Sequence, residues 1–559
     1  MKKKHIDYTN WSKDELVKEL KRIKETTYGL VWHRDVPQEK IDVLINPDAS
    51  TPEEMFANEV AGKPFPVLKE VKGKEVVSNK NDQTHILIEG DNYHSLAVLN
   101  FTHQEAIDVI YIDPPYNTGN KDFIYTDKYQ SDYVIKDDPF RHSKWLTFME
   151  KRLKLAKKLL KKDGAIFISI DDHEHAPLKM LCDEIFGEEN FIDSIIWDKK
   201  SSAKGVPPKN MMVNVHEYIL AYQNGDGFKF VGQERTEESG KFKNPDNDPR
   251  GPWRESNIKS TIKSANQAFT IIDPNTGKKY TNTWAFSKES LDRMIKENRI
   301  LWKDTLPKQK EFMNEMRNEN MAIRSNWGVF DAQSTTVFLK DLLPNTKFDN
   351  PKPISLMEYL IRVATKKDAT ILDFFAGSGT IAHAILKINS EDDGNRKFIL
   401  CTNNENNIAT EVCHLRLQKI MKGYKNNKDE KIKGFGGNLK YYTAYDFVES
   451  EPSDKNKHKL VNKCTEMLCI KEGIYDLETN TEDYKIFKSH DDRYLGIIFY
   501  EDAIEEYKKA IKKINGPINT YVFSLGDDPH TAQFADVADK VVLQAIPEII
   551  LKVYQEIFR

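Results

Sequence analysis

The stretch Ala106-Ile-Asp-Val-Ile-Tyr-Ile-Asp-Pro-Pro-Tyr116 decides the fold class of this chain. It begins as a short apolar, β-branched run and ends in a stiff polar turn, which is typical of a strand buried in a parallel sheet. The same alternation continues on both sides, with strands predicted at 84–88 and 165–170 and helices at 92–99 and at 144–160, the latter ended by Gly164. This alternation predicts an α/β fold with a doubly wound, Rossmann-like sheet.

A second α/β block lies far along the chain, and we expect the two blocks to share one sheet. Its predicted elements are helices at 355–365, 380–388 and 408–422 and strands at 370–374 and 397–402. The predicted organisation is an N-terminal arm (1–83), a first core block (84–198), an insert (199–345), a second core block (346–447) and a small C-terminal α/β domain (448–559).

Composition narrows the class of protein. The chain has 559 residues, enough for three or four folding units, and 39% hydrophobic residues, which excludes a collagen-like chain and argues against wholesale disorder. No secretory signal and no 18-residue apolar stretch is present, so the expected location is the cytoplasm, without a membrane partner. The cysteines follow no metal-binding spacing and are expected to be buried free thiols: Cys182, Cys401, Cys413, Cys464 and Cys469.

The net charge of −4 hides an uneven distribution. Residues 199–345 hold 24 Lys and Arg against 18 Asp and Glu, and four of the eight tryptophans. Residues 446–559 hold 15 Lys and Arg against 22 Asp and Glu. A local excess of positive charge is the footprint of a nucleic-acid partner, so the insert is the candidate for such contacts.

The turn Asp113-Pro114-Pro115-Tyr116 stands at the carboxyl end of a predicted strand, where open α/β sheets bind ligands. Two prolines fix the backbone and would hold the Asp113 carboxylate, the Pro114 carbonyl and the Tyr116 ring in one geometry. Two acceptors on an exocyclic amine would favour the pyramidal form that attacks an electrophile, while the ring stacks on the base. The alternative is a structural turn in which the aspartate caps the chain and the tyrosine is core.

A glycine loop, Asp373-Phe374-Phe375-Ala376-Gly377-Ser378-Gly379-Thr380, follows another predicted strand. Glycines let a ligand approach the backbone, and the next helix offers free amides. The third glycine of the dinucleotide fingerprint is absent, and Glu405 follows the next strand, where an acid would accept ribose hydroxyls. A nucleoside without pyrophosphate fits this pattern better than NAD does, although a structural turn is about as common for a single G-x-G.

Taken together, these motifs resemble the amino-methyltransferases of DNA, which use S-adenosylmethionine, and their order is that of the β group. The resemblance narrows to the modification (Mod) subunits of type III restriction-modification systems and runs from about residue 84 to 447. The segments that carry it are Gly90–Leu96, Asp113–Gly119, Arg141–Trp145, Lys352-Pro353, Asp373–Thr380, Cys401–Asn406 and Gly437–Tyr442.

The resemblance implies roles for individual residues. Asp113, Pro114, Pro115 and Tyr116 would form the catalytic turn that holds a flipped adenine, and aspartate in first position favours adenine N6 over cytosine N4. The implied cofactor-binding residues are Phe375, Gly377 and Gly379 at the methionine end, Asp373 in the same motif, Glu405 at the ribose, Lys352 and Pro353 on the cofactor side, and Asp91 beside the adenosine or, nearly as well, as a cap at the end of the preceding strand. No metal is needed for this chemistry.

The insert occupies the place of the family's target-recognition domain. Side chains such as Arg250, Arg254, Asn257, Gln267 and Arg324 would then reach base edges, although most are expected to be solvated surface. The implied partners are double-stranded DNA, a second copy of the chain and a separate restriction (helicase-nuclease) subunit. The chain has no phosphate-binding G-x-x-x-x-G-K loop, so any ATP-driven translocation would have to come from that restriction subunit. The alternatives are a solitary adenine methyltransferase and a catalytically silent DNA-binding subunit.

Overall fold

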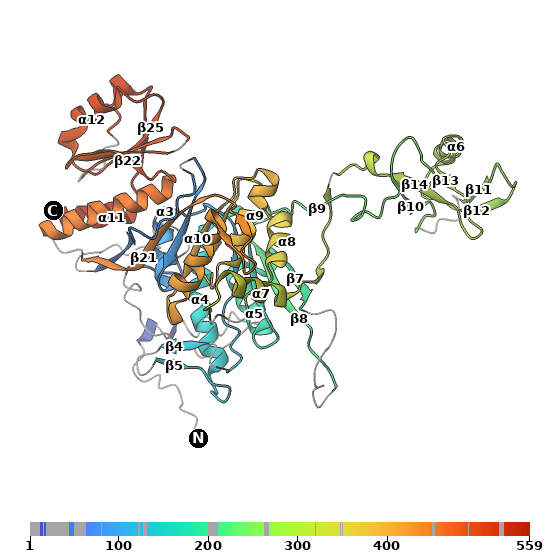
Figure 1. The fold of residues 1–559 in the computed structure, drawn as a ribbon, viewed down its shortest axis with the longest axis horizontal. Helices are drawn as coiled ribbons and strands as arrows, with labels where there is room; N and C mark the ends of the chain where they lie inside the picture. The colour runs from blue at the N-terminus through green and yellow to red at the C-terminus, as the bar shows by residue number, and fades with distance from the viewer. Residues whose placement is uncertain are drawn as a thin grey trace. The chain divides into compact units, whose positions relative to one another are not determined.

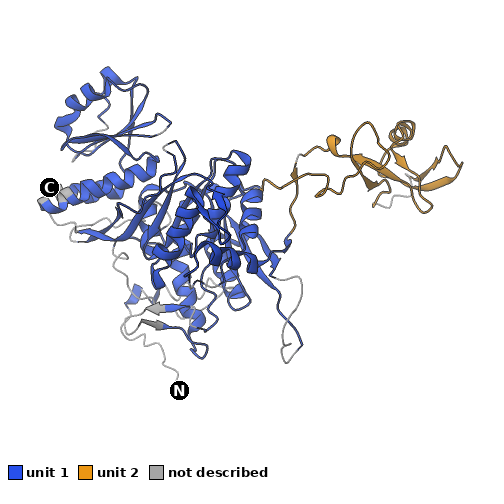
Figure 2. Cartoon of the chain, viewed as in Figure 1, with its two compact units in different colours: residues 1–229, 325–559 blue, residues 230–324 orange. Residues whose placement is uncertain are grey.

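A computed structural model shows how these segments fold (Figure 1). It describes residues 12–14, 16–17, 44–49, 63–79, 81–120, 123–126, 131–199, 211–261, 268–318, 320–346, 348, 350–449, 453–489, 491–524 and 530–558. Most of the predicted N-terminal arm lies outside these residues. The chain divides into two compact units, one made of residues 1–229 and 325–559 and the other of Phe230–Arg324 (Figure 2).

The larger unit is built on a ten-stranded sheet. Its strands in spatial order are β1 (Pro64–Glu70), β21 (Asn438–Glu449), β2 (Thr84–Glu89), β18 (Lys397–Thr402), β17 (Thr370–Asp373), β3 (Ile107–Ile112), β6 (Leu160–Ile170), β8 (His216–Gln223), β7 (Phe191–Asp198) and β16 (Asn326–Val329). The six strands from β21 to β6 run parallel, and β1 and β8 are antiparallel to their neighbours. Strand β17 of the second block pairs directly with β3 of the first, which confirms that both blocks share one sheet.

Helices form layers against this sheet. The first block supplies α3 (Asn92–Thr102), α4 (Arg141–Leu159) and α5 (His175–Phe186), and the later part of the chain supplies α7 (Ala332–Leu342), α8 (Ile354–Ala364), α9 (Thr380–Asp392), the π-helix η7 (Ile408–Cys413) and α10 (His414–Lys422). Alternate residues of β3 serve different layers, and Ile110 and Ile112 are fully buried in one core with Leu96 of α3 and Leu153 of α4. The doubly wound α/β class is therefore confirmed.

The role predicted for Gly164 is wrong. The helix predicted over 144–160 ends at Leu159, within one residue of the prediction, but Leu160 already starts β6, so Gly164 does not end the helix. Gly164 lies inside this strand, where a Cβ would come within 3.0 Å of the carbonyl oxygens of Ile107 and Asp108. The glycine therefore allows a close backbone approach to β3, next to an irregularity in the pairing.

The smaller unit, Phe230–Arg324, contains short strands and one helix. Its elements are β9 (Gln233–Glu234), β10 (Trp253–Asn257), β11 (Ala268–Ile272), β12 (Lys279–Thr283), α6 (Lys288–Lys296), β13 (Ile300–Leu301), β14 (Lys308–Phe312), η5 (Met313–Glu315) and β15 (Asn320–Met321). Its core includes Ile258, Trp284 and Leu291. This unit is shorter than the insert 199–345 that the sequence suggests, because β8 and β16 belong to the large sheet.

The C-terminal residues fold into a small α/β arrangement within the larger unit, in keeping with the predicted class. Its sheet has the order β22 (Asp476–Asn480), β23 (Tyr484–Lys488), β24 (Tyr494–Ile498), β25 (Ile518–Val522) and β26 (Val541–Gln544), and its helices are α11 (Asp454–Glu472), α12 (Ile504–Ile511) and α13 (Glu548–Phe558). The larger unit also contains two hairpins outside the C-terminal residues. These are β4 (Ile124–Thr126) with β5 (Ser131–Tyr133) and β19 (Gly423–Lys425) with β20 (Lys431–Lys433).

Some general expectations can be compared with the structure. All five cysteines are buried and free, as the sequence predicts. Among the described residues, no group of three or more histidine, cysteine, aspartate or glutamate side chains is arranged to hold a metal ion. Where the structure describes helices, none is long and apolar enough to cross a membrane.

Candidate active site

The two sequence motifs meet at one edge of the large sheet. Asp113 follows β3, Phe374 follows β17, and these strands are direct neighbours. The Asp373 carboxylate is buried and accepts a hydrogen bond of 2.9 Å from the backbone N–H of Phe375. Burial raises the pKa of Asp373 well above its usual range, and the nearby charge of Asp113 adds to this effect. The turn and the glycine loop therefore border the same place in the fold.

A lysine unites the side chains of the catalytic turn. Lys352 Nζ lies 3.2 Å from Asp113 Oδ1 and 2.9 Å from Glu217 Oε2. It also donates a hydrogen bond of 2.5 Å to the Tyr116 hydroxyl, which in turn donates to Glu217 Oε2 at 3.1 Å. Lys352 precedes α8, where Pro353 is the N-cap, and Glu217 comes from β8. Three separate parts of the chain thus build one polar cluster.

Burial and charge act against each other in this cluster. Burial lowers the pKa of the Lys352 ammonium, but Asp113 and Glu217 outweigh it and raise that pKa overall. For Glu217, burial raises the pKa, but Lys352 outweighs burial and the net change is downward. For Asp113, burial is the larger effect and the pKa is raised in spite of Lys352. Lys352 and Glu217 therefore form a charged pair beside a carboxylate that protonates more readily than usual.

The rest of the catalytic turn is held by neighbouring helices. Trp145 of α4 donates from its indole nitrogen to the Pro115 carbonyl at 2.7 Å. Asn117, with φ of +56°, donates to the fully buried Glu174 carboxylate at 2.6 Å. These contacts hold the residues immediately before and after Tyr116, so the turn is preorganised by packing as well as by its prolines.

The glycine loop has two residues in left-handed conformations. Gly377 has φ of +51° and Gly379, the N-cap of α9, has φ of +75°, and only glycine adopts these readily. Arg416, which is fully buried, donates to the Ser378 carbonyl at 3.2 Å and to Thr380 Oγ1 at 2.9 Å. Burial lowers the pKa of Arg416 to about 10. The buried Arg416 guanidinium thus holds the loop in place through these hydrogen bonds.

Two other predicted residues lie in different surroundings. Asp91 caps α3 by accepting a 2.7 Å hydrogen bond from Tyr93 N, and it pairs with Arg152 at 3.2 Å. Asp91 is thus a capping residue, but it caps the helix α3 and not the end of the preceding strand. Glu405 begins η6 (Glu405–Asn407) after β18 and is exposed, with the Tyr133 hydroxyl donating to it at 3.3 Å. An exposed carboxylate just after β18, the strand next to β17, remains able to accept ligand hydroxyls.

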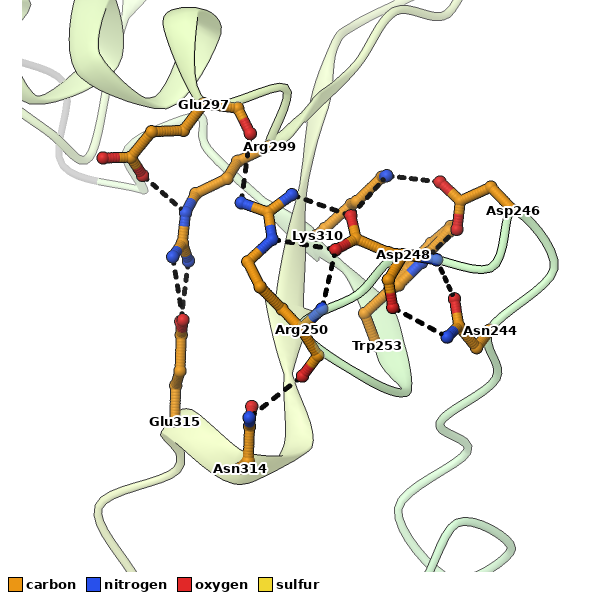
Figure 3. Close-up of polar contacts among 10 residues, drawn as sticks. All are labelled: Asn244, Asp246, Asp248, Arg250, Trp253, Glu297, Arg299, Lys310, Asn314 and Glu315. Atoms are coloured by element: carbon orange, nitrogen blue, oxygen red, sulfur yellow. Dashed lines mark hydrogen bonds and ion pairs between the residues drawn. The ribbon is translucent and has the colours of Figure 1, made fainter.

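Charged residues of the smaller unit pair with one another (Figure 3). Arg250 forms a 2.7 Å ion pair with Asp248, and Arg254 forms one of 2.6 Å with Glu311. Lys310 Nζ lies 3.1 Å from the same Asp248 carboxylate. Both arginines are thus engaged inside the unit. Of the other candidate base contacts, Asn257 is exposed on β10, Arg324 is exposed, and Gln267 lies outside the described residues.

Sequence reasoning missed Glu217. The region after residue 199 looks rich in turns, so its apolar run Tyr218–Tyr222 was not recognised as a strand. That run forms β8 against β6 and carries Glu217 to the catalytic turn. The run itself was the available signal, because a polar residue beside a buried strand end is a typical site position.

Comparison with known proteins tests the resemblance. The profile of a DNA methylase family, covering N6 and N4 methyltransferases, matches residues 107–412. The StyLTI Mod subunit of a type III restriction-modification enzyme from Salmonella typhimurium is 34% identical over 363 residues, which cover 60% of this chain and 55% of that protein. The EcoPI Mod subunit from Escherichia phage P1 is 32% identical over 388 residues, covering 58% of each chain.

A relative of another type is matched by this chain over more of its length than the Mod subunits are. The type II methyltransferase M.KpnI from Klebsiella pneumoniae is 34% identical over 352 residues, which cover 58% of this chain and 82% of that protein. The chain therefore spans little more than half of the Mod subunits that it matches but most of this methyltransferase. The similarity to Mod subunits that the motifs predict is confirmed. Because the family profile covers more than half of the sequence and both motifs, the chain belongs to the DNA methylase family.

Proposed function

We propose that this chain transfers a methyl group from S-adenosylmethionine to N6 of adenine at a specific sequence in double-stranded DNA. The observation that carries the proposal is the meeting of Asp113–Tyr116 and Gly377–Gly379 at the ends of the neighbouring strands β3 and β17. A base and a methyl donor held by these two segments would lie side by side, as direct transfer requires.

The side chains fit this chemistry. An adenine amine is a poor nucleophile because its lone pair is delocalised into the ring. The Asp113 carboxylate and the Pro114 carbonyl would accept its two hydrogens, while the Tyr116 ring stacks on a base extruded from the duplex. As the new carbon–nitrogen bond forms, the bond from the methyl carbon to the donor's sulfur would break and a neutral thioether would leave. The amine becomes positive and then loses one proton to water, so a carboxylate beside it stabilises the developing charge.

The glycine loop is suited to hold the cofactor, which supplies a methyl group activated by a positively charged sulfur. A Cβ at Gly377 would touch the Phe348 ring at an ordinary 3.7 Å, so the position is not crowded, and its φ of +51° is the conformation that calls for glycine. We assign Asp373, Phe375, Gly377 and Gly379 to the methionine end and Glu405 to the ribose. Asp91 caps α3, and we propose that it borders the adenosine by fixing the start of this helix.

Two biological settings follow from the relatives. The Mod subunits favour a modification and recognition subunit of a type III restriction-modification system, with a separate restriction subunit; a homodimeric assembly is what the family resemblance implies. M.KpnI, a type II methyltransferase of which the chain covers 82%, favours the alternative of a solitary adenine methyltransferase. Co-purification from the native host with a large helicase-nuclease supports the first setting, and a methylating protein that purifies without one supports the second. Light scattering of the pure protein tests the dimer.

A transfer assay tests the activity itself. Purified protein is incubated with labelled S-adenosylmethionine and DNA, and single-molecule sequencing of DNA from expressing cells identifies the methylated adenine and its context. Asp113→Ala should abolish transfer without changing the circular dichroism spectrum. Undiminished transfer by this variant, or methyl groups on cytosine, would contradict the proposal.

A further inference from the structure

The Lys352 ammonium directs its donors at the turn Asp113–Tyr116 and at Glu217. A lysine ammonium has three N–H bonds, and three acceptors surround this one: Asp113 Oδ1, the Tyr116 hydroxyl and Glu217 Oε2, at 3.2, 2.5 and 2.9 Å. The Lys352 side chain is only 13% exposed and that of Glu217 only 12%. The resemblance places Lys352 on the cofactor side, whereas these contacts are with the residues proposed to hold the base.

The contacts constrain how Asp113 and Tyr116 present themselves. Lys352 Nζ lies 3.2 Å from Oδ1 of Asp113, and the Tyr116 hydroxyl also interacts with this carboxylate. These contacts orient the carboxylate, whose Oδ2 would accept from another donor, such as the amine of a base. The Tyr116 hydroxyl is tied to both Lys352 and Glu217, which fixes the tilt of the ring. Lys352 Nζ also lies 4.7 Å from the centre of the Tyr116 ring. A turn held in this way loses little conformational freedom when a base binds.

A lysine at this place also carries an electrostatic cost. During transfer a positive charge moves onto the base amine, and a cation next to Asp113 opposes that movement. Glu217 supplies the compensating charge at 2.9 Å from Lys352, and its other oxygen lies 3.4 Å from Lys199. With Glu217 ionised, Lys352 can orient Asp113 without leaving a net positive charge beside the amine.

We propose that Lys352 and Glu217 are positioning residues for methyl transfer: Lys352 aims the second Asp113 oxygen at the base amine, and Glu217 neutralises Lys352 and fixes the Tyr116 ring. The proposal rests on the methyl transfer proposed above and assigns a role to Glu217, which no sequence motif marked. It places the contribution of Lys352 in the chemical step rather than in cofactor binding.

The first experiment separates the chemical step from cofactor binding. Glu217→Gln keeps the shape of the side chain and removes its charge, and Lys352→Met keeps its length. Both variants should lower the single-turnover rate about 10- to 100-fold, as expected for one charged hydrogen bond. Both should bind S-adenosylmethionine with an affinity within about twofold of the wild type by calorimetry. A twofold change in affinity corresponds to a binding free-energy difference of about 0.4 kcal/mol. The matched pair Glu358→Gln and Lys387→Met removes a 2.7 Å ion pair of α8 and α9 and should leave both quantities unchanged.

The pH dependence gives the two variants opposite signatures. Transfer needs Asp113 ionised, so the rate falls as the pH drops through the pKa of this carboxyl. The groups that face Asp113 are Lys352, Glu217, Tyr116, Tyr111 and Asp373. Removing the Lys352 charge raises the pKa of Asp113 and moves the acid limb to higher pH, whereas removing the Glu217 charge lowers this pKa and moves the limb to lower pH. A merely structural defect would lower the rate without displacing the limb in opposite directions.

The outcomes distinguish this proposal from the proposed function. If the wild-type protein transfers no methyl group to adenine, the proposed function fails. If the wild type is active, the positioning proposal is overturned by a Glu217→Gln rate equal to that of the wild type. It is also overturned by acid limbs that move together, or by a tenfold or larger loss of S-adenosylmethionine affinity in Lys352→Met, which would make Lys352 a cofactor ligand.

Discussion

Replacing Gly379 with alanine tests how tightly the glycine loop is packed. At φ of +75° an alanine pays about 1–2 kcal/mol for the left-handed conformation. Its Cβ would also lie 3.0 Å from the sulfur of Cys413, which is buried and must move by a few tenths of an ångström. This overpacking adds about 1 kcal/mol. We expect the free energy of unfolding to fall by about 2–3 kcal/mol in total.

Gly377→Ala is the matched control. It has the same kind of strain at φ of +51°, but its Cβ would meet the Phe348 ring at an ordinary 3.7 Å. It should therefore cost only the conformational term of about 1–2 kcal/mol. Adding Cys413→Ala to Gly379→Ala removes the tight contact, and a double-mutant cycle should show about 1 kcal/mol of favourable coupling.

Urea denaturation followed by circular dichroism, with thermal melting as a second probe, measures these differences. Each kcal/mol should correspond to about 1 °C in the melting temperature of the larger unit, because the entropy of unfolding grows with the number of residues that unfold together. Equal losses for the two alanine variants, or a cycle without coupling, would refute the assignment of the extra cost to Cys413.

Three further changes have defined outcomes. Glu405→Ala should weaken S-adenosylmethionine binding about tenfold in calorimetry, because charged hydrogen bonds to the ribose contribute about 1.5 kcal/mol, while unchanged affinity would remove Glu405 from the site. Lys310→Met leaves the buried Asp248 with one cation fewer and should destabilise the smaller unit by about 1–3 kcal/mol. Hydrogen exchange should become faster in residues 230–324 alone, and unchanged exchange there would mean that the ion pair is dispensable. Gly496→Ala places a Cβ 1.8 Å from the Tyr507 hydroxyl and should cost about 2–4 kcal/mol through overpacking and a lost buried hydrogen bond, whereas a wild-type melting temperature would show that the ring moves freely.

The sequence predicted the core sheet because its strands are continuous apolar runs bounded by turns. Strand 397–402 was predicted with the bounds that β18 has in the structure, and the two functional loops follow the strands that were predicted to carry them. The helix end at 160 was predicted within one residue, but the role of Gly164 was wrong. Glycine is a common helix terminator, whereas the actual role of Gly164, close contact with β3, depends on a partner 57 residues away.

The candidate site was predictable where its residues are neighbours in sequence. Asp113 and Tyr116 share one turn, but the charge that Lys352 meets comes from Glu217, 135 residues earlier in the chain. Side chains of this kind are assembled by strand pairing, here between β8 and β6, and a single sequence does not reveal that pairing. The same holds for Arg416, whose contact with Ser378 spans 38 residues.

The chain leaves the larger unit after residue 229 and returns at 325, and the strands that flank this excursion, β8 and β16, both pair with β7. A recombination event that exchanged only residues 230–324 would therefore keep every strand of the ten-stranded sheet. It would also keep Glu217, Lys352 and the catalytic turn. Evolution, or a protein engineer, can thus treat the smaller unit as a cassette, and the reaction chemistry can be inherited unchanged while that cassette is replaced.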